Sequence, residues 1–422
     1  MGTLLLRGGR PWGRDEPTDI LIEDGVIAAM GPQGDRAVGA VDVEVLDVSD
    51  RLVLPGLVDA HCHLDKTLYG GPWVPHPAGD ALADRIGTER RRRAELGVPD
   101  VNRIIDLLTA LVAAGTTTAR SHVDVAPELG LSGVEAVRRA LERVGDRISV
   151  QLVAFPQYGI LGEAGTADLM DQALAEGVEG VGGIDPAGMD GDPVRHLDIV
   201  FGLADKHGAM IDIHLHDGGS LGVWELELIC ERTKALGLQG RVTVSHAYGL
   251  GQASASEQDG VAARLAGAGV TITTGAVYDF PVAPVKRLHA AGANVACGHD
   301  GIRDLWGPYG TGDMLDRAMH LAYRSTFRRD DDIELALDAA TRGGAVALGV
   351  RPARDGGGDG GGDGDDADGG GDGSGGSPIV VGDAGDLVVV AASTPAEAVV
   401  TRPPREIVVK GGRVVAREGV VV

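Results

Sequence analysis

Two histidines separated by one residue, His61 and His63, end an apolar stretch near the start of the chain, LVLPGLVDAHCHLDKT at 52–67. The apolar run before them predicts a buried β-strand. Successive side chains of a strand point to opposite faces, so His61 and His63 share one face, about 7 Å apart, and Cys62 faces the other way. Two imidazoles on one face can share a divalent metal ion. A lone His-x-His pair also arises by chance, so the rest of the chain has to support the site.

Side chains that can bind metals or carry protons recur at the ends of later strand-like segments. They are His122, Asp124, Gln157, His214, His216, Asp217, His246, His299 and Asp300. In a parallel barrel the C-terminal ends of all strands meet at one face, and active sites lie there. Random placement of 12 histidines would seldom give this pattern. The sequence therefore predicts one active site built from many strand ends.

Eight strand-like segments must position these side chains. The first ends in the two histidines, and the others cover 116–125, 148–156, 178–185, 209–216, 241–247, 270–275 and 293–300. Apolar residues at three- and four-residue spacing lie between them and predict helices. The alternation predicts an α/β fold in which residues 55–350 form a closed (β/α)8 TIM barrel. An open doubly wound sheet is the alternative, and the lack of a GxGxxG motif after the first strand disfavours its nucleotide-binding form.

Both ends of the chain are rich in short β-strand patterns. Residues 1–54 and 379–422 alternate apolar and polar residues between glycine or aspartate turns. We expect the two segments to pair into one small β-sandwich domain, because two separate appendages would each have too few strands to be stable. Residues 355–377 consist almost entirely of glycine and aspartate. Such a segment cannot bury enough apolar area to offset its chain entropy, which predicts a disordered loop.

Composition limits the partners and the compartment. The formal net charge of −24 over 422 residues argues against a nucleic-acid partner. Three cysteines cannot all pair, which favours a reducing cytoplasm over a disulfide scaffold. No apolar stretch approaches the roughly 18 residues that span a bilayer, and the N-terminus lacks a signal-peptide core. We therefore expect a cytoplasmic protein with a small-molecule substrate and no membrane partner, and a homo-oligomer stays open.

Taken together, these segments resemble the metal-dependent amidohydrolase superfamily. The resemblance is carried by PGLVDAHCHLDK and by the residues His214, His246 and Asp300. The segments RSHVDV, QLVAFPQYGIL and GHDGIRDLW are similar to motifs of the cytosine deaminase branch. VGGIDPA, IDIHLHDGGSLGV, VTVSHAYG and IRDLWGPYGTGDM are similar to the s-triazine hydrolases that remove an alkylamine from the ring. The resemblance implies a barrel flanked by a β-sandwich, and family membership alone would not fix the substrate.

The resemblance and the residue types imply the same metal chemistry. His61, His63, His214 and Asp300 are expected to hold one divalent metal per subunit, with Zn²⁺ favoured and Fe²⁺ as the alternative. The metal-activated hydroxide would attack a ring carbon and expel an amine. Asp300 is expected to take the proton of the water, and His246 to act as a base or to stabilise developing charge. The predicted substrate is a small nitrogen heterocycle, either a cytosine-like pyrimidine or an N-alkylated aminotriazine.

Asp217 is the residue that departs from the cytosine deaminases, which have glutamate at this position as the proton shuttle. Aspartate is one methylene shorter and reaches about 1.5 Å less. We expect Asp217 to serve as the shuttle for a substrate other than cytosine, and His216 to point away from the metal.

Three further residues are predicted to bind substrate. By resemblance, Gln157 reads a carbonyl and a ring N–H, and the alternative is a solvated loop residue. Lys66 is expected to contact an anionic or carbonyl group, or else to be a surface lysine that pairs with Asp65. Trp306 is expected to form a wall of the pocket, with plain core packing as the alternative. The basic run TERRRRAEL at 88–96 is interpreted as a solvated helix face.

Two other functions have to be weighed. Binuclear cyclic-amide hydrolases of the superfamily carry a lysine on the fourth strand, whereas the segment at 178–185, VEGVGGID, contains none. A non-catalytic barrel that serves as a scaffold would lack metal ligands, and here the set is complete. The sequence therefore favours a mononuclear deaminase or amine-releasing hydrolase over both.

Overall fold

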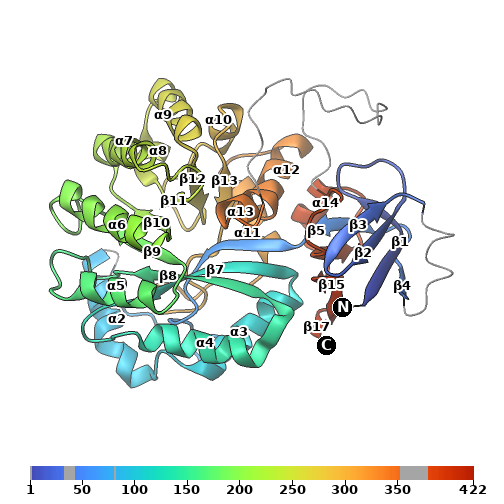
Figure 1. Cartoon of the computed structure of the whole chain (residues 1–422), viewed down its shortest axis with the longest axis horizontal. Helices are drawn as coiled ribbons and strands as arrows, with labels where there is room; N and C mark the ends of the chain where they lie inside the picture. Colours follow the sequence, from blue (N-terminus) through green and yellow to red (C-terminus); the bar gives the residue numbers. More distant parts are fainter. Residues whose placement is uncertain (1, 33–42, 80–81, 352–378) are drawn as a thin grey trace.

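The computed structural model describes residues 2–32, 43–79, 82–351 and 379–422. At its centre, eight parallel strands follow one another around a barrel in the order of the sequence (Figure 1). The strands are β6 (Leu57–Cys62), β7 (Thr116–Asp124), β8 (Ser149–Phe155), β9 (Gly180–Ile184), β10 (Met210–Leu215), β11 (Val242–His246), β12 (Val270–Thr274) and β13 (Val295–Cys297).

The last strand closes the barrel against the first. The backbone N–H of Asp300 donates to the carbonyl oxygen of His61 at 2.8 Å, and a parallel bridge joins Cys62 to Asp300. Gly298 makes this contact sterically feasible, because a Cβ there would lie 2.5 Å from the backbone nitrogen and oxygen of His61. The chain leaves β13 at this contact, so the strand is shorter than the predicted segment 293–300. The predicted (β/α)8 TIM barrel is confirmed.

Helices cover the outside of the strands (Figure 1). They are α2 (Leu82–Leu96), α3 (Val101–Ala113), α4 (Ser132–Val144), the 3-10 turn η1 (Gly145–Arg147), α5 (Thr166–Ala175), α6 (Pro193–His207), α7 (Gly219–Ala235), α8 (Tyr248–Gln252), α9 (Ala255–Ala268), α10 (Val285–Ala290), α11 (Met314–Arg324), α12 (Asp330–Ala339), α13 (Arg342–Ala347) and α14 (Pro395–Thr401). None of the helices in these ranges is both long and apolar enough to cross a membrane.

Helix α6 shows why the sequence forms these elements. Asp192 caps its start by accepting from the N–H of Arg195, and Pro193 occupies the first turn, where no donor is needed. Leu197, Val200, Phe201 and Ala204 recur at three- and four-residue spacing and are buried. The helix ends at Gly208, whose φ of 65° is left-handed.

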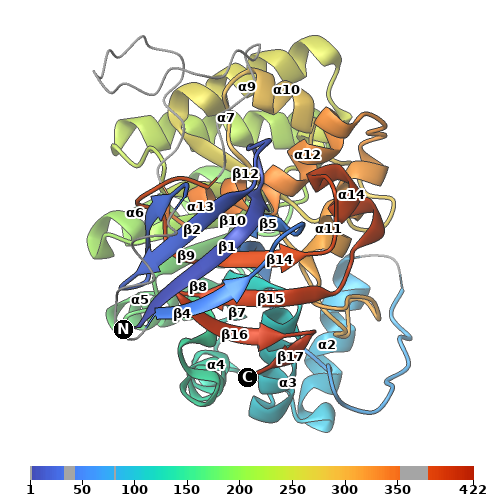
Figure 2. The ribbon, with the colours of Figure 1, turned by 90° about the vertical axis from the view of Figure 1, so that its right-hand side faces the viewer.

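Strands from both ends of the chain form a second, mixed sheet domain beside the barrel (Figure 2). They are β1 (Thr3–Pro11), β2 (Thr18–Glu23), β3 (Val26–Met30), β4 (Val43–Asp47), β5 (Leu52–Pro55), β14 (Leu387–Val390), β15 (Arg405–Lys410), β16 (Arg413–Arg417) and β17 (Val420–Val421). Strand β5 pairs with β1 on one side and with β14 on the other, so it joins the two termini. The composite terminal domain is confirmed, and the Gly/Asp-rich segment 355–377 lies outside the described residues.

Candidate active site

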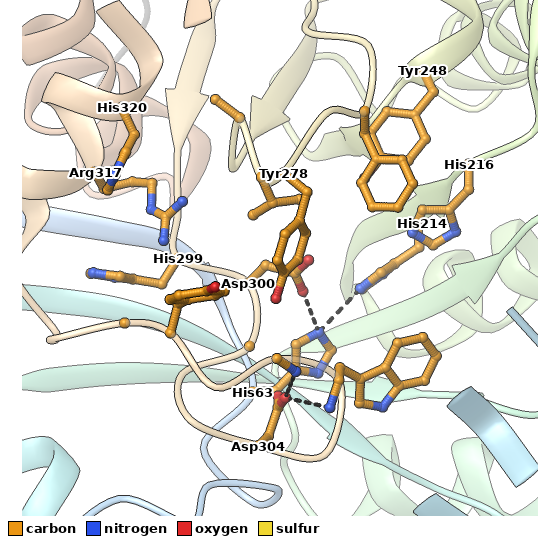
Figure 3. Close-up of a pocket in the computed structure, with 18 of the residues that line it drawn as sticks. His63, His214, His216, Tyr248, Tyr278, His299, Asp300, Asp304, Arg317 and His320 are labelled. Atoms are coloured by element: carbon orange, nitrogen blue, oxygen red, sulfur yellow. Dashed lines mark hydrogen bonds and ion pairs between the residues drawn. The ribbon is translucent and has the colours of Figure 1, made fainter. Parts of the chain in front are cut away.

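The four predicted ligands converge at the C-terminal ends of the barrel strands. Figure 3 shows three of them, His63, His214 and Asp300. Nε2 of His63 lies 3.3 Å from Oδ1 of Asp300 and 3.3 Å from Nε2 of His214. Nε2 of His61 lies 3.6 Å from the same carboxylate oxygen. All four ligand atoms lie within 4.8 Å of one another, which is close enough for one ion to contact them all.

Hydrogen bonds behind His61 fix which of its nitrogens faces the others. The hydroxyl of Ser245 donates to the carboxylate of Asp212 at 2.7 Å, so it accepts from Nδ1 of His61, 2.8 Å away. Nδ1 therefore carries the ring proton, and Nε2 keeps its lone pair. Nε2 is buried and has no hydrogen-bond partner among the described residues. An unpartnered lone pair aimed at a carboxylate and two more imidazoles is the donor arrangement of a metal site.

Burial sets the charge of the site. It lowers the pKa of His63 to about 4 and the pKa of His214 well below its ordinary value. Burial would raise the pKa of Asp300, but the imidazoles of His61 and His63 beside its carboxylate outweigh it and hold that pKa well below its usual range. At neutral pH the site thus offers the neutral imidazoles of His63 and His214 and the carboxylate of Asp300, which are protonation states that metal binding requires.

His246 ends β11 beside these ligands. Its ring centroid lies 5.0 Å from that of His61 and 5.1 Å from that of His214. Its backbone has a left-handed φ of 72°, and Asp300 has one of 65°. Such conformations are costly for residues other than glycine and gather at functional sites. His246 Nε2 is buried without a partner in the described part of the chain, so it is available to exchange a proton.

A cavity of about 650 Å³ opens onto the ligands. The structure brings the three predicted substrate-binding residues, Gln157, Lys66 and Trp306, to its wall. Lys66 and Gln157 are buried, so the alternatives of a surface lysine and a solvated glutamine are wrong. Lys66 Nζ donates to Oε1 of Gln157 and lies 3.0 Å from Oδ1 of Asp124.

Aromatic side chains that the sequence did not single out form another part of the wall. Tyr248 and Phe280 stack with their centroids 5.1 Å apart, and Tyr278 packs edge-on against Phe280 at 6.2 Å. Figure 3 shows Tyr248 and Tyr278 facing the cavity above His214 and Asp300. Tyr248 begins the short helix α8 after β11, and Tyr278 and Phe280 come from the loop after β12, which no periodic pattern marks.

The structure does not bring Asp217 to the cavity. Its carboxylate accepts from the backbone N–H of Gly188 at 2.8 Å, away from the ligands. His216 lines the cavity instead, stacked on His246 with centroids 4.5 Å apart. The expectation that His216 points away was wrong, because residues two apart on an extended chain face the same side and His214 already faces the ligands. Nδ1 of His216 is held by Asp185 at 2.8 Å.

Behind Asp217 lies a buried carboxyl group, Glu225. Burial, followed by the nearby charge of Asp217, raises its pKa to about 8. The folded protein therefore holds a proton on Glu225 that the unfolded chain, with the ordinary pKa of about 4.5, has lost at neutral pH.

We predict a pH-dependent stability difference between the wild type and Glu225→Gln. Because folding raises the pKa of Glu225, the folded state binds more protons, and stability falls as pH rises through the window from about 4.5 to about 8. Glutamine is neutral throughout. Urea unfolding at several pH values should show the wild type losing stability relative to the variant across that window. A constant difference would contradict a raised pKa.

The basic run 88–96 also differs from the expectation. Two residues of α2, Glu89 and Arg93, are buried and ion-paired at 3.3 Å, so the interpretation as a solvated face is wrong for them. They stand four residues apart on a buried face of the helix, and Glu89 accepts from Nε1 of Trp306 at 2.8 Å. The spacing was visible in the sequence, but the partners that bury it are distant in the chain.

Known proteins share this architecture. The sequence model of the Amidohydrolase family matches residues 44–358. N-isopropylammelide isopropyl amidohydrolase of Pseudomonas sp. (strain ADP) is 31% identical over 417 residues, 95% of this chain and 96% of that protein. The uncharacterized protein YahJ of Escherichia coli (strain K12) is 34% identical over 302 residues, which are 71% of this chain and 65% of YahJ, a little under two thirds of its length.

Solved structures extend the match over the whole chain. The crystal structure of N-isopropylammelide isopropylaminohydrolase from Burkholderia multivorans superposes with a TM-score of 0.88 at 41% identity and covers 100% of both chains. The 5-methylcytosine deaminase of Klebsiella pneumoniae, liganded with 5-fluorocytosine, has a TM-score of 0.78 at 23% identity and covers 98% of this chain and 97% of that one. At that identity the second likeness concerns the fold alone.

Proposed function

Because this chain belongs to the amidohydrolase family, we propose that it releases an alkylamine from an N-alkylated aminotriazine such as N-isopropylammelide. The family and its relatives make the chain a hydrolase of carbon–nitrogen bonds other than peptide bonds. The narrower choice of substrate is supported by the 41% identity, over both full chains, with an N-isopropylammelide isopropylaminohydrolase.

His61, His63, His214 and Asp300 would hold the metal ion, for which we propose Zn²⁺ with Fe²⁺ as the alternative. When bound there, the ion lowers the pKa of a water molecule and supplies a nucleophile at neutral pH. Strand β9 has the sequence GVGGI and offers no lysine for a second ion, which supports a mononuclear site over that of a cyclic-amide hydrolase.

Two side chains are proposed to handle protons. His246 Nε2 is neutral because burial holds the pKa of this imidazole well below its ordinary value, so it can accept a proton from the attacking water. It then returns the proton to the amine nitrogen, which must be protonated to leave. The carboxylate of Asp300 lies between the imidazoles and can take part in the same transfer.

The walls of the cavity fit a flat ring with an apolar substituent. Trp306 and Gln157 stand on one side, and Tyr248, Tyr278 and Phe280 supply an aromatic surface on another. A neutral alkyl group gains by packing on such a surface and needs no hydrogen-bond partner there. The three unpaired, buried cysteines agree with the reducing cytoplasm that we propose as the compartment.

The test is the metal-loaded protein against cytosine, isocytosine, isoguanine, ammelide and N-isopropylammelide, with the released amine identified by mass spectrometry. We expect isopropylamine from N-isopropylammelide and little ammonia from cytosine. Ammonia from cytosine as the main product would replace the triazine proposal by a cytosine-type deaminase. No amine from any of the five compounds would contradict both.

The role of Asp217 can be decided separately with Asp217→Asn. Because its carboxylate accepts from Gly188, and an asparagine oxygen can do the same, we predict that kcat falls less than about tenfold. A proton shuttle would lose about 10²- to 10⁴-fold. Steady-state kinetics with metal content measured in parallel separates the two, and the larger loss would restore Asp217 to the role predicted from the sequence.

A further inference from the structure

A buried network ties helix α2 to three side chains of the cavity wall. Oε2 of Glu89 accepts from Nε1 of Trp306 at 2.8 Å and lies 3.7 Å from Nζ of Lys66. Lys66 in turn donates to Gln157. Glu89 has only 1% of its surface exposed, and no part of the proposed chemistry uses it. Its carboxylate can therefore affect the cavity wall only through the residues that it contacts, Trp306 and Lys66.

Arg93, one turn along α2, holds the network from behind. Its guanidinium lies 3.3 Å from Oε1 of Glu89 and 3.3 Å from Oδ2 of Asp65, and it also pairs with Asp124. Two cations thus lie among three carboxylates, all of them buried. Removing either cation would leave a buried carboxylate without a partner, which is strongly unfavourable. The geometry of the network is fixed for this reason.

The ammonium of Lys66 has two of its donors committed to side chains of the protein, those of Gln157 and Asp124. An ammonium carries three N–H donors and no acceptor. Oε1 of Gln157, Oδ1 of Asp124 at 3.0 Å and Oε2 of Glu89 at 3.7 Å surround it. Burial alone would lower the pKa of Lys66, but these carboxylates outweigh it and raise that pKa, so the side chain stays charged. Lys66 therefore serves to hold Gln157.

The contact with Lys66 determines how the amide of Gln157 is oriented and which of its groups is available to a ligand. A lysine can only donate, so the oxygen of the amide must face Lys66. The NH₂ end is then the part of the side chain left for a ligand, and it can only donate. The ligand atom that meets this NH₂ group must accordingly be an acceptor, such as a ring oxo group or an unprotonated ring nitrogen.

We propose, on the premise of the function proposed above, that Glu89 is a positioning residue that fixes Lys66 and Trp306 so that Gln157 presents a hydrogen-bond donor to an oxo-substituted ring. Glu89 contacts no reacting atom. It sets the orientation of two walls of the cavity, the amide of Gln157 through Lys66 and the indole of Trp306 directly. The ring of Trp306 also lies 5.5 Å from Nζ of Lys66, so the two walls move together.

The variant Glu89→Gln tests this role. Glutamine is nearly the same size as glutamate but has no charge, so we expect Lys66 and Gln157 to lose their fixed arrangement. We expect KM for the hydrolysed substrate to rise at least about tenfold, the size of a lost charged hydrogen bond, with kcat and metal content little changed. The matched control is Glu95→Gln on the same helix, whose side chain is 66% exposed and pairs with Arg92 at 3.6 Å. It should leave KM unchanged.

A double-mutant cycle separates positioning from general damage. If Glu89 acts through Gln157, Glu89→Gln should add little to the KM of Gln157→Ala, apart from its effect on Trp306. Fully additive rises in KM would overturn the proposal, and so would an unchanged KM in Glu89→Gln. If Glu89→Gln fails to fold, Glu89→Asp keeps the charge with a shorter reach and should give a smaller rise in KM with the same coupling to Gln157.

A readout without turnover keeps this test independent of the substrate. The emission of Trp306, obtained as the difference between the wild type and Trp306→Phe, should shift in Glu89→Gln and stay constant in Glu95→Gln. If the wild type hydrolyses none of the compounds, the proposed function fails while the emission shift still tests the link between Glu89 and Trp306. An unshifted emission would remove that link.

Discussion

Replacing Asp300 by asparagine is expected to abolish amine release and to strip the metal from a folded protein. Asparagine has nearly the same shape, but it removes the carboxylate that lies 3.3 Å from His63 and 3.6 Å from His61. Without that charge, three imidazoles remain, and they hold a divalent ion far less well. We expect the metal content to fall from one per chain towards zero and kcat to fall by more than about 10³-fold.

Metal analysis and activity on the same preparation check this result. The matched control is Asp171→Asn, because Asp171 also pairs with a histidine, His207 at 2.6 Å, but on α5 and α6 away from the cavity. That variant should keep both metal and turnover. Normal turnover in Asp300→Asn with the ion still bound would mean that the assignment of Asp300 as a ligand is wrong.

His246→Asn is expected to lose turnover as well, but to keep the metal that Asp300→Asn loses. The imidazole of His246 is not one of the four converging ligands, yet it lies beside two of them and keeps an unpartnered Nε2 among the described residues. Removing a group that carries a proton to and from the reacting atoms costs about 10²- to 10⁴-fold in rate. We therefore predict a fall in kcat of that size at unchanged metal content.

His207→Asn serves as the control, since His207 is a half-buried imidazole bound to a carboxylate outside the cavity. It should behave as the wild type. If His246→Asn lost the metal in proportion to its activity, His246 would have to be counted among the ligands. If it kept full activity, the proton would have to travel by another route, for which His216 is the neighbouring candidate.

The barrel could be predicted because each of its strands can be recognised from the local sequence. The strands in the segment from Leu57 to Cys297 are short and alternate with stretches of helical periodicity, and every predicted segment contains a strand. The predicted resemblance to the amidohydrolases is confirmed by the family match and by relatives that cover the whole chain. The end of β13 could not be predicted from the sequence, because the close approach of Gly298 to His61 on the first strand determines it.

The convergence of the four proposed metal ligands could also be predicted, since histidine and aspartate at strand ends must meet in a closed barrel. The prediction for His216 was wrong because His214 and His216 are two residues apart on an extended chain, so their side chains face the same side. Glu89 and Arg93 were missed for a different reason. A charged residue on a helix reads as exposed unless its partners are known, and theirs, Trp306 and Asp124, come from distant parts of the chain.

The pairing of β5 with β14 has a consequence for how the protein is made. Strand β5 leads through Gly56 directly into β6, the strand that leads to His61 and His63, and its partner strand β14 follows all four proposed ligands in the chain. All four therefore leave the ribosome before β14 exists, and the edge of β5 that β14 covers stays unpaired until β14 has been made. A chain that stopped just before β14 would contain every proposed ligand and would still present this open edge, which is a template for pairing with another chain.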